Sequence, residues 1–183
     1  MDTTKSLISI NRTASWILAL VSVVMLATGY IVTRFDVNKS LIIYIHTNLC
    51  YVFTAIFIIH FYISVFIIRY PWKHTLENLL RGKMGKWTLI KLTQQISGWA
   101  IVFGAGLLII TGLSWYGIFW WIIPFAKHRF IDVLAGVSII VHVSTGSKCA
   151  LTRRHMGGQT ANMLIILLSI ILIVIVFCVD SIS

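Results

Sequence analysis

The chain has 183 residues, of which 58% are hydrophobic and only 11% are charged. Soluble globular domains carry about 25% charged residues, so this composition excludes an ordinary soluble domain and indicates an integral membrane protein. The formal net charge of +10 would suit a nucleic-acid binder, but the basic residues fall between long apolar stretches, which argues against nucleic acid as a partner.

Five apolar stretches are long enough to cross about 30 Å of hydrocarbon as helices. In chain order they cover residues 14–33, 41–68, 96–115, 130–146 and 161–179. The first stretch follows a polar leader, and no small-residue cleavage site precedes the next span, so we expect a membrane helix and not a cleaved signal peptide. The predicted fold class is all-α integral membrane, with residues 1–183 forming a single transmembrane domain.

The basic residues predict an orientation in the membrane. Eleven of the fifteen lysines and arginines precede the first span or lie between the second and third spans and between the fourth and fifth. The other connections hold the remaining four, which are Arg34, Lys39, Lys127 and Arg129. By the positive-inside rule, the amino terminus is cytoplasmic and the carboxyl terminus outside, in a multi-pass protein of the cytoplasmic (inner) membrane.

The spans contain an internal repeat. Two dipeptides recur at the same separation on the first and third spans: Ser15-Trp16 with Thr28-Gly29, and Gly98-Trp99 with Thr111-Gly112. The second and fourth spans each carry two histidines fourteen residues apart: His46 with His60, and His128 with His142. The chain is therefore interpreted as a duplicated helix pair, forming a four-helix bundle, followed by a fifth helix.

The intramembrane histidines are the first functional candidates, because a histidine in hydrocarbon is costly unless its ring nitrogens have partners. Residues fourteen apart stay on one helix face, about 21 Å apart along the axis, which leaves room for two haems. A low-spin haem iron takes two axial nitrogens from opposite sides. We predict an outer haem between His46 and His128 and an inner haem between His60 and His142, each imidazole giving its other N–H to an acceptor that the pattern does not identify.

Small residues on the first and third spans support this interpretation. A porphyrin is a rigid plate, and a helix approaches it closely only where side chains are minimal. Four small residues fall in register with the histidines: Gly29 and Gly112 at the outer level, and Ser15 and Gly98 at the inner level. Two further histidines, His74 and His155, lie in basic connections and are not expected to be ligands.

This pattern resembles the haem-bearing four-helix bundle of the cytochrome b family over roughly residues 14–146, although Ser15 stands where a glycine is expected. The resemblance implies two b-type haems (heme b), with the four histidines as axial ligands and the four small residues in contact with the haems. The size is more similar to the small dihaem membrane anchors of formate dehydrogenases and hydrogenases. It implies a non-catalytic respiratory-chain subunit that carries electrons between a redox partner subunit, of iron–sulfur or cytochrome c type, and a membrane quinone.

Haem propionates need cations or hydrogen-bond donors. The candidates are Arg34, Lys127 and Arg129 at the outer level, and Arg12, Arg69 and Lys148 at the inner level. A site for the lipid-soluble carrier needs proton-exchanging groups beside a haem, for which the candidates are Lys91, Gln94 and Gln95. Each of these residues also fits a role in topology or as an interfacial side chain.

The competing hypothesis is a transporter that uses the histidines as metal ligands or proton relays. A transporter is expected to carry acidic residues and broken helices within its spans, whereas here only Asp132 lies near the interior of a span and no proline interrupts one. A third hypothesis, a structural anchor with histidines as packing residues, does not account for the register of the four histidines.

Overall fold

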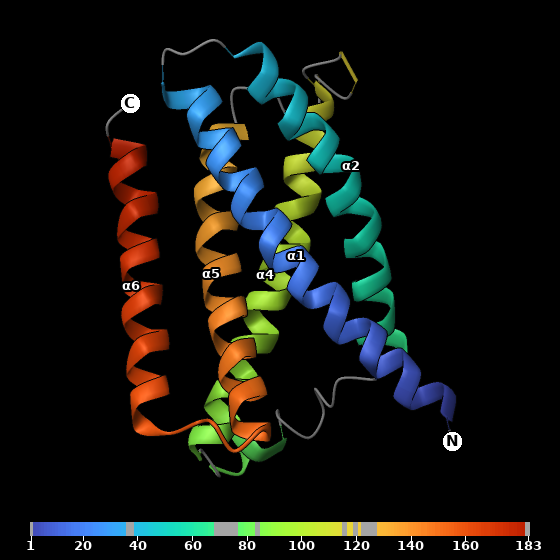
Figure 1. Ribbon diagram of the computed structural model, residues 1–183, viewed down its shortest axis with the longest axis vertical. Helices are drawn as coiled ribbons and strands as arrows, with labels where there is room; N and C mark the ends of the chain where they lie inside the picture. Colours follow the sequence, from blue (N-terminus) through green and yellow to red (C-terminus); the bar gives the residue numbers. More distant parts are fainter. Residues whose placement is uncertain are drawn as a thin grey trace. The chain divides into compact units, whose positions relative to one another are not determined.

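The computed structural model describes residues 2–35, 39–67, 77–82, 85–114, 117–118, 121 and 128–181. Over this part of the chain the protein is helical and contains no strand, which confirms the all-α class (Figure 1). The chain divides into two compact units, Met1–Leu76 and Glu77–Ser183. The prediction that they form one transmembrane domain stays a prediction.

The first unit is a helical hairpin. Helix α1 (Asp2–Arg34) packs against α2 (Ser40–Tyr62), which continues directly into a π-helical turn, η1 (Ile63–Ile67). Few residues separate α1 from α2, so the two helices run antiparallel. A π-turn inside a helix is uncommon and often marks a functional site. Here it begins directly after the turn that carries His60.

The long helices of the second unit, among its described residues, are α4 (Lys86–Ser114), α5 (His128–Arg153) and α6 (Gln159–Ser181). Helix α5 lies in the middle and packs against both α4 and α6. Helix α4 lies close to α5 at Gly104, where an added Cβ would lie 3.5 Å from Ala135 Cβ. Ala135 is only 2% exposed, so this contact forms part of the core of the unit.

In the part of the chain that the structure describes, five helices are long and apolar enough to cross a membrane, the same number as the predicted spans. Their insertion in a membrane stays a prediction. The structure places them at Lys5–Val32, Ser40–Ile67, Lys86–Ser114, Phe130–Arg153 and Gln159–Cys178. The third helix begins ten residues earlier than its predicted span, and the fourth continues beyond Gly146 to Arg153. Backbone hydrogen bonds extend a helix past its apolar core into polar sequence, so these bounds exceed the hydrophobic stretches.

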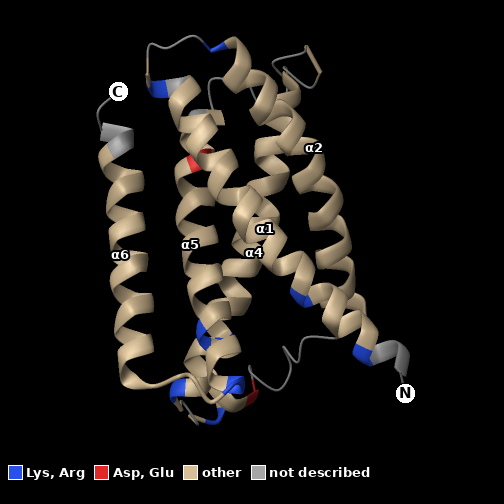
Figure 2. Ribbon diagram, viewed as in Figure 1, with Lys and Arg blue, Asp and Glu red and all other residues tan. Residues whose placement is uncertain are grey.

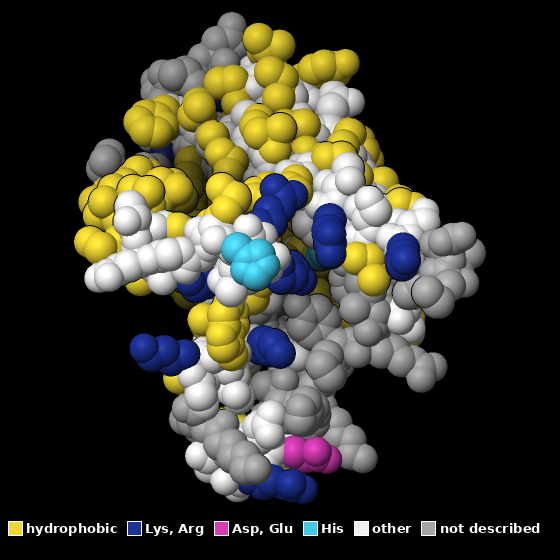
Figure 3. Space-filling view, turned by 60° about the horizontal axis from the view of Figure 1, so that its bottom comes forward, with side chains coloured by type: hydrophobic (Ala, Val, Ile, Leu, Met, Phe, Trp, Pro, Cys, Tyr) yellow, Lys and Arg dark blue, Asp and Glu magenta, His cyan; other side chains and the backbone are white. Residues whose placement is uncertain are grey.

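The described surface suits a multi-pass membrane protein. Large apolar side chains on the helices are widely exposed, among them Leu20, Phe103, Phe130 and most of α6. Most Lys and Arg residues lie toward the helix ends, while the middles of the helices are largely uncharged (Figure 2). Figure 3 looks at the lower end of Figure 1 and shows several Lys and Arg side chains on that face.

Candidate functional site

In the first unit, the outer histidine lies against a threonine and a glycine of the neighbouring helix. His46, on α2, has its Nδ1 2.9 Å from Thr28 Oγ1 on α1. A Cβ added at Gly29 would lie only 3.3 Å from His46 Cε1, so the ring packs against the bare backbone of that glycine. The same Thr28 oxygen lies 2.8 Å from the carbonyl oxygen of Val24, to which it can donate its proton.

The second unit repeats this arrangement. His128 is the first residue of α5, and its Nδ1 lies 2.8 Å from Thr111 Oγ1 on α4. Thr111 is completely buried, and its oxygen lies 2.8 Å from the carbonyl oxygen of Leu107. A Cβ at Gly112 would lie 3.9 Å from His128 Cε1, an ordinary contact. A Thr-Gly pair thus faces an outer histidine in both units.

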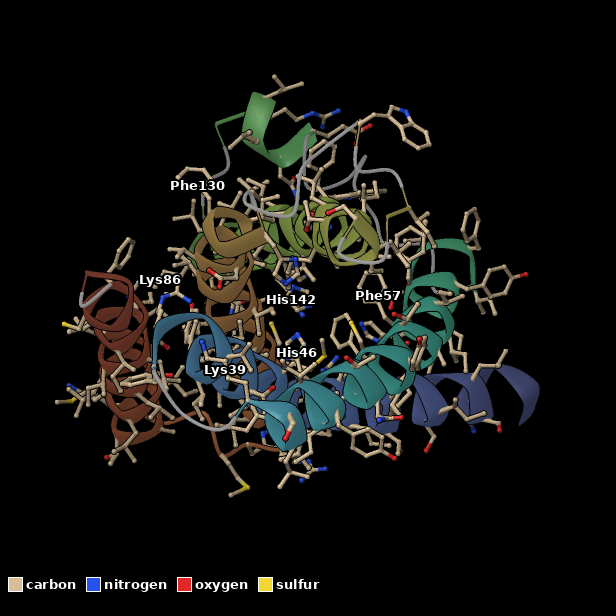
Figure 4. All side chains as sticks on the ribbon, turned by 90° about the horizontal axis from the view of Figure 1, so that it is seen from above. Lys39, His46, Phe57, Lys86, Phe130 and His142 are labelled. Carbon is tan, nitrogen blue, oxygen red and sulfur yellow. The ribbon has the colours of Figure 1, made fainter. Side chains whose placement is uncertain are left out.

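The inner histidine of the second unit has two acceptors. His142 Nδ1 lies 3.0 Å from the carbonyl oxygen of Gln94 and 3.3 Å from Ser97 Oγ (Figure 4). A carbonyl oxygen accepts but never donates, so Nδ1 must carry the proton. In neutral imidazole Nε2 then has the lone pair, which is the form that binds a metal. A Cβ at Gly98 would lie 3.2 Å from His142 Cε1, which is tighter than an ordinary contact.

The inner histidine of the first unit uses a different residue for the same contact. His60 Nδ1 lies 3.3 Å from Ser15 Oγ, which is also 2.7 Å from the carbonyl oxygen of Asn11. In the repeat, Ser15 stands at the position of Gly98. Its hydroxyl therefore gives a physical reason for the departure from glycine at this position.

The two members of each predicted ligand pair belong to different units. His46 and His60 lie in Met1–Leu76, whereas His128 and His142 lie in Glu77–Ser183. Within each unit the structure places both histidines against the preceding helix. The pairing across each haem stays a prediction.

The predicted propionate residues are only partly described. The guanidinium of Arg34 lies 4.4 Å above the ring of Tyr30. Arg12 is exposed on α1. Lys148 Nζ donates to the carbonyl oxygen of Gly157 and to Asn162 Oδ1, so it ties α5 to the start of α6. The structure does not describe Lys127, Arg69 or the side chain of Arg129. His74, which was not expected to be a haem ligand, also lies outside the described residues.

The three predicted carrier-site residues have different surroundings. Lys91 is exposed, and Gln94 uses its backbone oxygen for His142 and its side-chain Oε1 to accept from Cys149 Sγ at 3.6 Å. Gln95 is 5% exposed, and neither its Oε1 nor its Nε2 has a hydrogen-bond partner. The predicted role in carrier binding stays a prediction.

Sequence reasoning missed the hydroxyl groups that contact the histidines, namely those of Thr28, Thr111, Ser97 and Ser15. The available signal was the threonine directly before the glycine in both halves of the repeat. Ser97 had no such signal, because its counterpart in the first half is Ala14.

The fold and site define a class: an all-helical protein suited to the membrane, with four histidines whose Nδ1 atoms face oxygen atoms. Among the described residues, no group of three or more His, Cys, Asp or Glu could hold a metal ion. A haem iron needs no such group, because the porphyrin supplies the equatorial ligands and the protein only the axial ones. Comparisons with protein-family models, curated proteins and solved structures gave no match to this chain.

Proposed function

We propose that this chain is a dihaem cytochrome of the b type that carries electrons across the cytoplasmic membrane. In this proposal His46 and His128 hold an outer haem, and His60 and His142 hold an inner haem. The chain works as a non-catalytic subunit between a redox protein partner and a membrane quinone. The cytoplasmic amino terminus and the external carboxyl terminus follow from the distribution of basic residues.

The observation that carries the proposal is the contact at Nδ1 of all four histidines. Each Nδ1 lies 2.8 to 3.3 Å from a hydroxyl oxygen on the preceding helix. Metal-ligating histidines nearly always donate their second ring N–H to an oxygen acceptor, most often a carboxylate, a backbone carbonyl or water, and this fixes the ring and its tautomer. Any buried histidine needs a partner for its ring N–H. What favours ligands over packing residues is that the same contact recurs at four equivalent positions of the repeat.

The donor set also fits a haem. Imidazole nitrogens are common axial ligands, and the haem supplies one-electron chemistry as its iron alternates between the ferric and ferrous states. The chain's residues orient the imidazoles, and the apolar helices exclude water. At Gly29 and Gly98 a side chain would press on the ligand ring, with contacts of 3.3 and 3.2 Å to Cε1, so the space beside these rings depends on glycine.

The direct test is the visible spectrum of the protein purified in detergent from cells able to make haem. We expect b-type bands in the reduced-minus-oxidised spectrum and about two haems per chain. A preparation without haem whose circular dichroism shows a folded helical protein would refute the proposal.

Ligand pairing is tested with alanine variants. His60→Ala and His142→Ala should each remove the same haem and leave one per chain, and the double variant should lose no more than either single variant. Combining His142→Ala with His46→Ala should remove both haems. If His60→Ala and His142→Ala remove different spectral components, the pairing is wrong even though haem is bound.

A histidine-using metal or proton transporter is the second candidate. The observation that favours it is Asp132, a carboxyl residue only 8% exposed on α5, one turn after His128. A transporter of this kind would contain bound metal ions or move protons without haem. Haem and metal content are therefore measured on the same preparation. Two haems per chain support the cytochrome, whereas protein that is folded without haem supports the transporter.

A further inference from the structure

The inner histidines receive their hydroxyl contacts from different positions in the repeat. Positions eighty-three residues apart correspond on α1 and α4, so Ala14 matches Ser97 and Ser15 matches Gly98. The burial agrees: Ala14 is 7% exposed and Ser97 5%, whereas Ser15 and Gly98 are both half-buried. The hydroxyl therefore stands one residue later in the first unit than in the second, and in both units it contacts the inner histidine.

The hydrogen bond that Ser15 makes within its own helix sets the direction of its contact with His60. A hydroxyl has one proton, and Ser15 Oγ lies 2.7 Å from the carbonyl oxygen of Asn11, a better-placed acceptor than His60 Nδ1 at 3.3 Å. With the proton given to Asn11, the oxygen accepts Nδ1–H of His60. This direction leaves the lone pair on Nε2, as the Gln94 carbonyl does for His142.

We propose that Ser15 is the positioning residue of His60: its hydroxyl fixes the tautomer and rotation of the ring and makes Nε2 a stronger ligand. This inference rests on the proposed function, because the ligand strength is measured on bound haem. Ser15 replaces a predicted glycine because it supplies an acceptor that the second unit obtains from Ser97 and the Gln94 carbonyl. Loss of such a partner typically lowers metal affinity about 10–100-fold.

A serine in a membrane helix can also bond only to its own backbone, so the experiment needs a matched control. Thr13 provides one, because its Oγ1 is 3.3 Å from the carbonyl oxygen of Ser9 on the same helix and it is exposed. Ser15→Ala and Ser15→Gly both remove the hydroxyl. The alanine variant keeps the Cβ, and the glycine variant removes it as well. The relocated variant Ala14→Ser/Ser15→Gly copies the Ser97-Gly98 order of the second unit. Ala14 is one of the residues that line an apolar groove of the first unit, so the relocated hydroxyl would stand at the edge of this groove.

Haem content, haem affinity and the two reduction potentials are measured for each purified variant, with circular dichroism as the check on folding. Ser15→Ala and Ser15→Gly should weaken binding of the inner haem about 10-fold. They should also raise its reduction potential, because a less basic imidazole stabilises the ferric state less. Thr13→Ala should match the wild type in both quantities. Ala14→Ser/Ser15→Gly should recover most of the lost affinity and shift the potential back.

The possible results separate this inference from the proposed function. Wild-type protein that folds without haem overturns both. If the wild type binds two haems but Ser15→Ala and Ser15→Gly keep the affinity and potential of the inner haem, only the role of Ser15 is overturned. An equal change in Thr13→Ala also overturns it, since the effect then belongs to the helix and not to the ring.

Discussion

Replacing Gly98 by alanine tests the position of the His142 ring. A Cβ at Gly98 would lie 3.2 Å from His142 Cε1 and 3.4 Å from Nδ1, whereas carbon atoms prefer separations of about 3.5–4.0 Å. The ring must therefore move by a few tenths of an ångström, which disturbs its 3.0 Å contact with the carbonyl oxygen of Gln94. Overpacking of this kind costs about 1–3 kcal/mol of unfolding free energy.

Two other glycines of α4 serve as controls. Beyond its own stretch of helix, no atom of the described residues lies within 4 Å of a Cβ added at Gly106. Gly106→Ala therefore measures the gain of about 0.5–1 kcal/mol from replacing a helical glycine. Gly112 is a predicted haem contact like Gly98, but its added Cβ would lie 3.9 Å from His128 Cε1. The difference between Gly112→Ala and Gly98→Ala therefore isolates the contact with the histidine ring.

The assay is thermal unfolding of the purified variants in one detergent, followed by circular dichroism. We expect Gly106→Ala to be the most stable variant, Gly112→Ala the next and Gly98→Ala the least. The unfolding free energies of Gly112→Ala and Gly98→Ala should differ by about 1–3 kcal/mol. For a chain of this size, each kcal/mol shifts the unfolding temperature by roughly 2–4 °C. If Gly98→Ala unfolds at the same temperature as Gly112→Ala, the His142 ring does not lie against Gly98.

Three further predictions concern the rest of the molecule. Ser144 and Ser169 share a 2.6 Å hydrogen bond between α5 and α6. A double-mutant cycle with their alanine variants should give a coupling energy of about 0.6 kcal/mol, and additive effects would contradict the contact. Lys148→Met should make the α5–α6 connection more sensitive to limited proteolysis, since it removes the donor to Gly157 and Asn162; an unchanged cleavage rate counts against this. Reporter fusions should place the amino terminus in the cytoplasm and the carboxyl terminus outside; the reverse result refutes the charge argument.

The sequence was sufficient to predict the five long apolar helices, because a long, mostly apolar stretch has few alternatives to a helix that can cross a membrane. The predicted bounds of the helices were less accurate where a helix ends in polar sequence. Helix α4 begins at Lys86 and α5 continues to Arg153, because a helix ends where its hydrogen bonds end and not where its hydropathy falls. The π-turn at Ile63–Ile67 has no periodic signal, since it depends on how the backbone packs after His60.

The predicted glycine positions rest on the same periodicity as the histidines, which is why spacing alone indicated both. The acceptors at Nδ1 could not be predicted in this way. A threonine or serine in a membrane helix most simply bonds to its own backbone, as Thr28 does to Val24. Whether its oxygen also reaches a ring on the neighbouring helix depends on the rotation of that helix, which the sequence does not give.

The separations between hydroxyl and histidine indicate what the duplication has kept. At the outer level, Thr28 precedes His46 by 18 residues and Thr111 precedes His128 by 17, so the connection is one residue shorter in the second half. If the inner serine stood at equivalent positions of α1 and α4, its separation from the inner histidine would likewise be one residue shorter in the second half. Instead Ser15 precedes His60 by 45 residues and Ser97 precedes His142 by 45. The inner hydroxyl thus stands at positions of α1 and α4 that differ by one residue, yet it contacts the inner histidine in both halves, as expected if this contact determines where the serine stands.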